Sequence, residues 1–337
     1  MLRSRNPYGH RSSRGEVVTE VSDSDQRSKC SCCYLNEHEG EEAAIRDAEV
    51  RGDLRDRALA QSREVGGTPV ALCSHSAIVA LVCGRFVSSH SADKIAQFFG
   101  ASFEGEALPE NFNVAPTNDV YGVVQAADGS REVQSFHWGL VPSWAKDVKI
   151  GSKMINARAE TIGEKPAFKG LFKKHRLIIP MDGFYEWQQA GAGAPLSKTG
   201  KPMKTPMFIH RVDGQPLAVA GLWATWRDKA AGSVDSHAPT VWLHSCTVIT
   251  TAANDTMAPV HDRMPVVLPA EAWAAWLDPT NNDLASLQHL LVPAPHDVLT
   301  MHAVSTAVNN VRNKGAQLMD PVAPGGEALS GVVGLCL

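Results

Sequence analysis

The order of strand-like and helix-like segments after residue 82 restricts the fold. Long β-rich runs such as "RLIIPMDGFYEW" (176–187) and "SCTVITTAAN" (245–254) are separated by only a few short helical patterns. One of these, "SSHSADKIAQFFG" (88–100), has serine or aspartate at its start and Gly100 at its end. Because strands and helices do not alternate regularly, a doubly wound parallel sheet is disfavoured. We expect an α+β fold in which an antiparallel, barrel-like sheet is flanked by helices.

Turn signals and periodicity place the other elements. "TPMFIHRVDGQPLAVAGLWATW" (205–226) contains two β-rich runs around Asp213-Gly214, a strong hairpin signal. "PVHDRMPVVL" (259–268) predicts a further strand, while "PAEAWAAWLD" (269–278) and "DLASLQHLL" (283–291) predict helices. The run 188–202 is rich in glycine and proline and predicts a surface loop.

The chain changes in composition near residue 82. Residues 1–82 are mostly polar or charged with few large apolar side chains, so they cannot bury enough surface to offset the entropy of ordering. We therefore expect a disordered leader over 1–82, a catalytic domain over 83–321 and a tail over 322–337. Within the leader, "CSCC" (Cys30, Cys32, Cys33) and Cys73 lack the paired C-x₂-C spacing of a zinc site, so no metal is expected there.

Bulk composition excludes several classes of protein. The 337 residues are 44% hydrophobic and carry a net charge of −4, so nucleic acid would have to be met by a local groove rather than by a basic surface overall. No apolar run reaches the roughly 18 residues of a membrane span, and we expect no membrane partner. Seven cysteines without a secreted-domain spacing favour a reducing cytoplasm. No cofactor is implied by the globular residues.

Four short blocks place reactive residue types in otherwise apolar surroundings. They are "CGRF" at Cys83, "MINARAET" at Asn156 and Arg158, "GFYEW" at Glu186 and "HDRMP" at His261. Each has a plain alternative. Cys83 could be a buried structural cysteine, Asn156 and Arg158 could cap and brace a helix start, and Glu186 could be an exposed acid at a strand end. His261-Asp262-Arg263 could be a solvated turn or a local salt bridge. Together the four blocks supply a thiol, a carboxyl group, an imidazole, an amide and arginines, which is the inventory of an active site.

The combination resembles the SOS-response-associated peptidase (SRAP) family. The resemblance is carried, in the family's order, by "CGRF", "NVAPTN" (113–118), "WGLVPSWAKD" (138–147), "NARAET" (156–161), "IPMDGFYEW" (179–187), "AGLW" (220–223), "TTAANDTMAPVHDRMPVVL" (250–268) and "VNNVRNKG" (308–315). It runs from Cys83 to about Pro321 and leaves out residues 1–82 and the tail.

The resemblance implies a DNA-damage protein that crosslinks itself to abasic sites in single-stranded DNA. The implied crosslink is a thiazolidine built from the α-amine and thiol of an N-terminal cysteine, here Cys83. The family motifs would make Glu186 the general acid/base, His261 an aid to sugar opening or strand scission, and Asn156 an orienting amide. We expect such a protein to act as a monomer in the cytoplasm, on the nucleoid.

The same resemblance implies the DNA contacts. Arg85 and Arg158 would hold flanking phosphates, because a guanidinium binds phosphate with two hydrogen bonds. Trp138, Trp144 and Pro116 would form an apolar wedge on which bases stack or unstack. "KGLFKKHR" could extend a basic track or could be a solvated helix face; its cations are Lys169, Lys173, Lys174 and Arg176.

The chemistry conflicts with the written start of the chain, because an internal Cys83 has an amide nitrogen. One valine codon, GUG, is also an initiation codon in bacteria, so translation that begins at Val82 and loses its methionine would expose Cys83. Alternatively, a real leader is removed by proteolysis or self-cleavage, or the extension is functional and this chemistry is absent.

Two rival functions remain on the sequence alone. A thiol hydrolase would pair Cys83 with His261 and orient the imidazole with Glu186, and it needs no free amine. A non-catalytic binder of single-stranded DNA would use the same arginines and tryptophans for affinity only. The hydrolase does not explain the arginines or the aromatic loop, and the binder predicts binding without a covalent adduct.

Overall fold

The computed structural model describes residues 83–191, 194, 196–197, 199–227 and 242–322. The predicted leader with its cysteine cluster, and the tail beyond Val322, lie outside the described residues. Within them the strands form two sheets that meet along a shared apolar core.

The larger sheet closes into a barrel. Its strands, in spatial order, are β12 (Arg263–Pro265), β11 (Trp242–Ala252), β10 (Leu217–Arg227), β7 (Arg176–Met181), β4 (Asp119–Gln125), β5 (Arg131–Trp138) and β2 (Ser102–Phe103). β5 also pairs with β11, in parallel, at Ser245↔His137 and Cys246↔Trp138, so the five strands between them form a closed ring. β6 (Asn156–Arg158) also pairs in parallel with β11, further along the edge that β5 occupies and opposite β10. The expected barrel-like α+β fold is confirmed, and its closure makes the barrel mixed rather than purely antiparallel.

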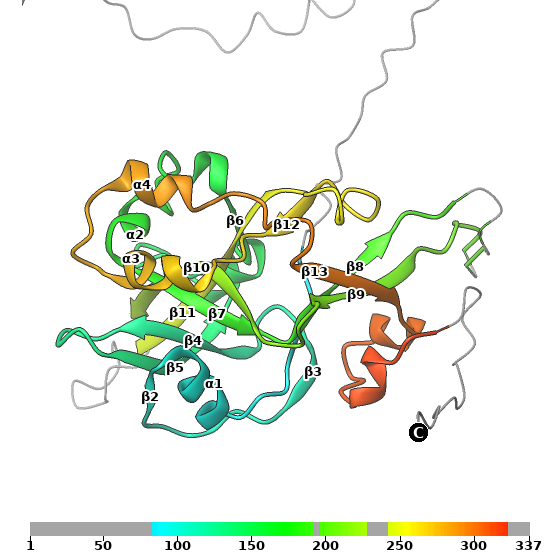
Figure 1. Cartoon of the computed structure of the whole chain (residues 1–337), viewed down its shortest axis with the longest axis horizontal. Coiled ribbons are helices and arrows are strands. Elements are labelled where there is room, and N and C mark those ends of the chain that lie inside the picture. The colour runs from blue at the N-terminus through cyan, green and yellow to red at the C-terminus, as the bar shows by residue number, and fades with distance from the viewer. Residues whose placement is uncertain (1–82, 192–193, 195, 198, 228–241, 323–337) are drawn as a thin grey trace, which may run out of the picture. The chain divides into compact units, whose positions relative to one another are not determined.

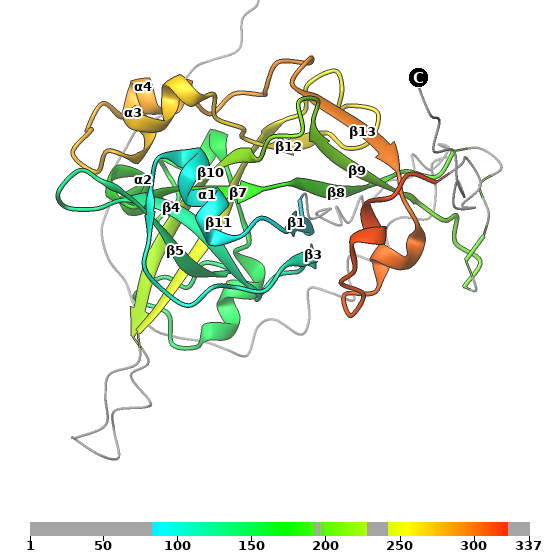
Figure 2. The same cartoon turned by 60° about the horizontal axis from the view of Figure 1, so that its bottom comes forward.

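The smaller sheet has five strands and reaches away from the barrel (Figure 1). Its order is β13 (Leu299–Ala303), β9 (Thr205–Arg211), β8 (Gly183–Gln188), β1 (Phe86–Ser88) and β3 (Asn111–Val114). The segment after β13 folds back beside β9 and β13, where Val304 forms a bridge with Pro321 (Figure 2).

Four short helices cover the barrel. They are α1 (Ala92–Phe99), α2 (Lys169–Lys174), α3 (Trp273–Leu277) and α4 (Leu284–His289). Short 3₁₀ turns lie elsewhere in the described residues, at Val148–Lys153, Ala159–Thr161, Ala270–Ala272, Thr306–Asn309 and Ala316–Met319. α1 begins and ends as the sequence predicts: the Ser91 side chain accepts from the Lys94 N–H, and Gly100 takes the left-handed conformation with φ of 59°. No helix among these residues is long and apolar enough to cross a membrane.

The predicted hairpin at Asp213-Gly214 is wrong in its pairing. Both strands exist, and Gly214 has the positive φ of 69° that the turn requires. However, β9 pairs with β8 and β13, whereas β10 pairs with β7 and β11, so the two strands enter different sheets. The first six residues of β10 are all buried, so both faces of this part of the strand are covered. Such a strand belongs in the barrel wall and not in an isolated two-stranded hairpin, which would leave one face exposed to solvent.

Candidate functional site

The backbone N–H of Cys83 donates to the Glu186 carboxylate, and this contact defines the centre of the site. β1 and β8 pair antiparallel with Phe86 opposite Phe184, and the Tyr185 N–H donates to the Arg85 carbonyl at 2.9 Å. Continued by one residue, this register sets Glu186 opposite Gly84. Cys83 itself has a φ of 50°, a conformation that costs a residue with a side chain roughly 1–2 kcal/mol. Such strain is concentrated at functional sites.

Glu186 is a buried acid, not the exposed strand-end carboxylate of the plain alternative. Glu186 belongs to the second half of β8, and the residue is 3% exposed. Burial raises its pKa from 4.5 to about 7, although hydrogen bonds from the backbone N–H groups of Cys83 and Trp187 oppose the shift. A carboxyl group with a pKa near neutrality can both give and take a proton under physiological conditions.

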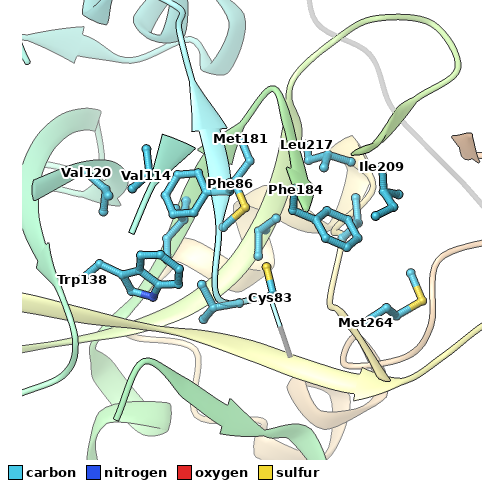
Figure 3. Packing of buried hydrophobic residues seen from close by; sticks show 14 of the residues in the cluster. Cys83, Phe86, Val114, Val120, Trp138, Met181, Phe184, Ile209, Leu217 and Met264 are labelled. Atoms are coloured by element: carbon cyan, nitrogen blue, oxygen red, sulfur yellow. The ribbon is translucent and has the colours of Figure 1, made fainter. Parts of the chain in front are cut away.

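The thiol of Cys83 is completely buried and is held in its protonated form. Burial, and then the charge of Glu186, raise the pKa of the thiol well above its ordinary value. Figure 3 shows the Cys83 side chain pointing into a cluster that contains Phe86, Trp138 and Phe184. The thiol is therefore not a ready thiolate, because reactive thiolates have a lowered pKa.

His261 lies in the turn before β12. Its Nδ1 accepts from the Arg263 N–H at 3.1 Å and lies 2.7 Å from the Asp262 carboxylate. Gln188, at the end of β8, donates to the carbonyl of Pro259 at 3.4 Å, and the charge of Asp262 contributes to the pKa of Glu186. The turn is thus next to the Glu186 end of β8, but no direct bond joins His261 to Cys83 or Glu186 among the described residues.

β6 holds Asn156 and Arg158 beside β11, and Arg158 directly precedes the 3₁₀ turn Ala159–Thr161 without capping it through its side chain. Asn156 is half-buried opposite Val248, and Arg158 is exposed at the end of the strand. The neighbouring Glu160 forms two hydrogen bonds of 3.0 Å with Arg263, which also donates to the Thr250 carbonyl at 2.7 Å. The partner of Arg263 is therefore Glu160, which is distant in sequence, rather than its neighbour Asp262.

Arg85 is anchored rather than free. Its Nη1 donates to the side chain of Asn113 at 2.8 Å and to the carbonyl of Val308 at 2.9 Å. The guanidinium lies 5.8 Å from the ring of Trp187, whose indole N–H in turn donates to Asn309 at 2.7 Å. The segment after β13 thus forms a wall of the site, a role that sequence reasoning missed for Asn113 and Asn309.

The expected aromatic wedge is corrected at one position. Trp138 has no exposed surface; its indole N–H donates to the Ile155 carbonyl at 3.1 Å and its ring packs 5.0 Å from that of Phe86. A fully buried ring cannot stack with a base, so Trp138 is a core residue. Trp144 is 61% exposed and borders a hollow of about 340 Å³, while Pro116 is half-exposed in the turn between β3 and β4.

The possible basic track is also corrected at one residue. Arg176 is 2% exposed, and its guanidinium donates to main-chain carbonyls of Trp276 at 2.6 Å and Phe172 at 2.7 Å, among others. It therefore ties β7 to α2 and α3 instead of facing a ligand. Lys169, Lys173 and Lys174 are exposed on α2. No cluster of histidine, cysteine and acidic side chains able to hold a metal occurs in the described part of the chain.

Comparison with known proteins assigns this arrangement to a family. The sequence model of the SOS response associated peptidase (SRAP) family matches residues 82–311. The chain belongs to this family. It is 40% identical over 245 residues to the abasic site processing protein YoaM of Bacillus subtilis, a match that covers 71% of this chain and 98% of the relative.

More distant SRAP relatives align over a similar region. The abasic site processing protein YedK of Escherichia coli is 30% identical, covering 72% of this chain and 100% of that one. The abasic site processing protein HMCES of Gallus gallus is 32% identical, covering 60% and 62%. A crystal structure of a protein from Bacteroides thetaiotaomicron superposes with a TM-score of 0.60 at 26% identity, covering 72% of this chain and all of that one.

Proposed function

We propose that this SRAP protein processes abasic sites in DNA by forming a covalent thiazolidine with Cys83, in single-stranded DNA and as part of a damage response. The observation that carries the proposal is the contact between the Cys83 nitrogen and the buried Glu186 carboxylate. The names of the relatives support the substrate class, since each is an abasic site processing protein.

The first chemical step uses the nitrogen of Cys83. A ring-opened abasic site presents an aldehyde at C1′, and the α-amine of a chain that begins at Cys83 attacks this carbon to give a carbinolamine. An α-amine with a pKa near 8 is unprotonated in roughly one molecule in seven at pH 7, whereas a lysine is so in fewer than about one in a thousand. Glu186 accepts the proton released from nitrogen and returns it to the departing hydroxyl group, so that water leaves and an imine forms.

The second step uses the sulfur. The Cys83 thiol adds to the imine carbon, forming a C–S bond while its proton passes to the imine nitrogen. The product is a five-membered thiazolidine, and one water is released overall. Neither step needs an oxidant, a metal or a cofactor. A thiol that stays protonated until the imine forms suits this order, because addition across the imine consumes both the sulfur and its proton.

The reaction requires that residues 1–82 be absent, either because translation begins at Val82 and the initiating methionine is then lost or because the leader is removed. Cleavage before Cys83 would release an amine, and Glu186, with a pKa of about 7, is positioned to protonate that leaving nitrogen. The geometry favours this use of the site over a cysteine hydrolase. A hydrolase needs a thiolate paired with an imidazole, whereas the Cys83 thiol has a raised pKa and it is the Cys83 nitrogen that contacts the Glu186 carboxyl group.

The test compares a chain beginning at Cys83 with the full 337-residue chain. Each is mixed with an oligonucleotide carrying one abasic site, and the covalent adduct is measured on a denaturing gel. Without reduction we expect the adduct only from the chain beginning at Cys83. Cys83→Ala and Cys83→Ser keep the α-amine but lack the thiol, so each should give only an imine that survives after borohydride reduction. Equal crosslinking by the full chain, or by Cys83→Ala, would contradict the proposal.

A further inference from the structure

Two cations, Arg85 and Lys314, lie side by side next to the Cys83–Glu186 pair. Arg85 is two residues from Cys83, and its guanidinium lies over Trp187, the residue after Glu186. Lys314 comes from the other end of the domain, in the segment after β13. The fold therefore brings to the site a second cation that lies far from Arg85 in the chain.

Asn113 holds both cations. This residue of β3 is completely buried, and its side-chain oxygen accepts from Arg85 Nη1 at 2.8 Å while its backbone carbonyl accepts from Lys314 Nζ at 2.7 Å. Its side-chain nitrogen lies within hydrogen-bond distance of three carbonyls of the same segment, those of Val308 (3.1 Å), Asn310 (3.1 Å) and Asn313 (3.0 Å). One amide thus fixes Arg85, the loop and Lys314 together.

The charges of this pair are not neutralised within the described residues. Lys314 otherwise donates to the neutral side chains of Asn111 at 3.0 Å and Asn118 at 3.5 Å, and Arg85 to a carbonyl. Neither forms an ion pair with a carboxylate in the part of the chain that is described, unlike Arg211 with Asp213 (2.5 Å).

The two cations also repel each other. Burial, and then the charge of Arg85, lower the pKa of Lys314. Only neutral groups hold these two positive charges in place, so an anion bound between them would reduce their repulsion.

We propose that Lys314 and Arg85 together bind the phosphodiester backbone of the DNA strand beside the reacting abasic residue, with Asn113 as their positioning residue. This inference rests on the proposed function for the identity of the strand. Arg85 supplies a planar guanidinium with an edge that Asn113 and Val308 leave unused, and Lys314 supplies a point charge. Because both contacts are to phosphate, they add affinity without sequence preference.

The experiment measures binding of the full 337-residue chain to an undamaged fluorescent single strand across a series of salt concentrations. For single strands the logarithm of the affinity falls with the logarithm of salt by about 0.7 per phosphate contact, so Lys314→Met should reduce the slope by about that amount. We expect its affinity near 0.1 M salt to fall roughly three- to tenfold. Lys314→Arg should keep the slope of the natural chain. Lys94→Met, at an exposed lysine of α1, is the matched control and should change neither quantity.

Asn113→Asp tests the positioning role. The new carboxylate would neutralise part of the cation pair and lose the contacts to the three carbonyls, so the salt slope should fall by more than in Lys314→Met. Circular dichroism establishes whether this variant is folded; if it is not, the Lys314 variants decide. A slope in Lys314→Met equal to that of the natural chain overturns the inference, as does a loss in Lys314→Arg as large as in Lys314→Met.

Two further arms separate this inference from its alternatives. Inorganic phosphate, added at constant ionic strength, should compete with the strand for these cations and weaken binding of the natural chain more than that of Lys314→Met. Equal weakening of the two chains would overturn the assignment of a DNA phosphate to Lys314. Crosslinking by the chain that begins at Cys83 is measured in parallel. Absence of any adduct, together with the expected lower slope in Lys314→Met, would contradict the proposed function alone. Normal crosslinking with the same slope in Lys314→Met and the natural chain would contradict the phosphate contact alone.

Discussion

The Cys83 backbone N–H and the Glu186 carboxylate are hydrogen-bonded although 103 residues separate them in the chain. The pairing follows from β1 and β8 lying antiparallel at the point where the small sheet meets the barrel core. It puts a buried acid at the one nitrogen that the proposed chemistry uses. The same burial that makes Glu186 useful as an acid/base also costs stability, and this cost is measurable.

The stability of the full chain should fall as pH rises from about 4.5 to about 7. Between these values the folded state keeps the Glu186 proton that the unfolded chain has lost, so the folded state binds more protons and the free energy of unfolding decreases with pH. The shift from 4.5 to about 7 corresponds to roughly 3 kcal/mol. Urea denaturation at pH 5 and pH 8 checks this, with Glu186→Gln as the comparison. We expect the variant to lose most of the decrease, and an identical pH response in both chains would show that Glu186 is not the cause.

Crosslinking should depend on the same carboxyl group. In a chain that begins at Cys83, Glu186→Gln keeps the shape and removes the proton transfer, so the rate of adduct formation should fall roughly 10²- to 10⁴-fold. Quenched time points on a denaturing gel give the rate. Glu132→Gln on β5 is the matched control, because the Glu132 side chain accepts a hydrogen bond from the Gln134 side chain and lies on a different sheet from Glu186. A Glu186→Gln rate within a factor of two of the parent would remove Glu186 from the chemistry.

Much of the fold and the outline of the site could be predicted from local sequence signals. The Ser91 cap and Gly100 stop of α1 follow from local hydrogen bonding and φ preferences, and they hold whatever surrounds them. The irregular order of elements was enough to exclude a doubly wound sheet. The family motifs, for their part, were enough to assign Cys83 and Glu186 to one site.

The features that the sequence did not predict correctly depend on contacts between segments that are distant in the chain. Asp213-Gly214 forms its turn, yet the sequence does not reveal that β10 is buried on both faces and pairs away from β9. Trp138 and Trp144 lie in one motif and have the same chemistry, but only the barrel closure at Cys246↔Trp138 determines that one is core and the other exposed. Asn113 shows the same limit, because its partners lie about 200 residues later in the chain.

Substitution of the two tryptophans should separate stability from DNA binding. Trp138→Ala removes a fully buried ring and should lower the free energy of unfolding by roughly 3–5 kcal/mol. Trp144→Ala removes an exposed ring and should change stability by no more than about 0.5 kcal/mol. If a base stacks on Trp144, its loss should weaken single-strand binding by about 1–3 kcal/mol. Urea denaturation and fluorescence anisotropy measure the two effects, and unchanged binding in Trp144→Ala would mean that the strand does not contact this ring.

The position of the loop that carries Trp144 should depend on the close approach of the Gly139 and Gly151 backbones. Gly139 has a φ of 135°, and a Cβ there would lie 2.7 Å from the carbonyl oxygen of Gly151, a main-chain atom that cannot turn aside. Gly139→Ala should therefore destabilise the domain by roughly 2–5 kcal/mol, from backbone strain and overpacking together. Gly163→Ala is the matched control, because a Cβ at that position meets nothing within 4 Å and should shift the free energy of unfolding by no more than about 0.5 kcal/mol. Thermal and urea unfolding of the two variants decide the matter. Equal stability of Gly139→Ala and Gly163→Ala would mean that the loop can move away from Gly151, and Trp144 would then be carried by a pliable segment instead of a fixed one.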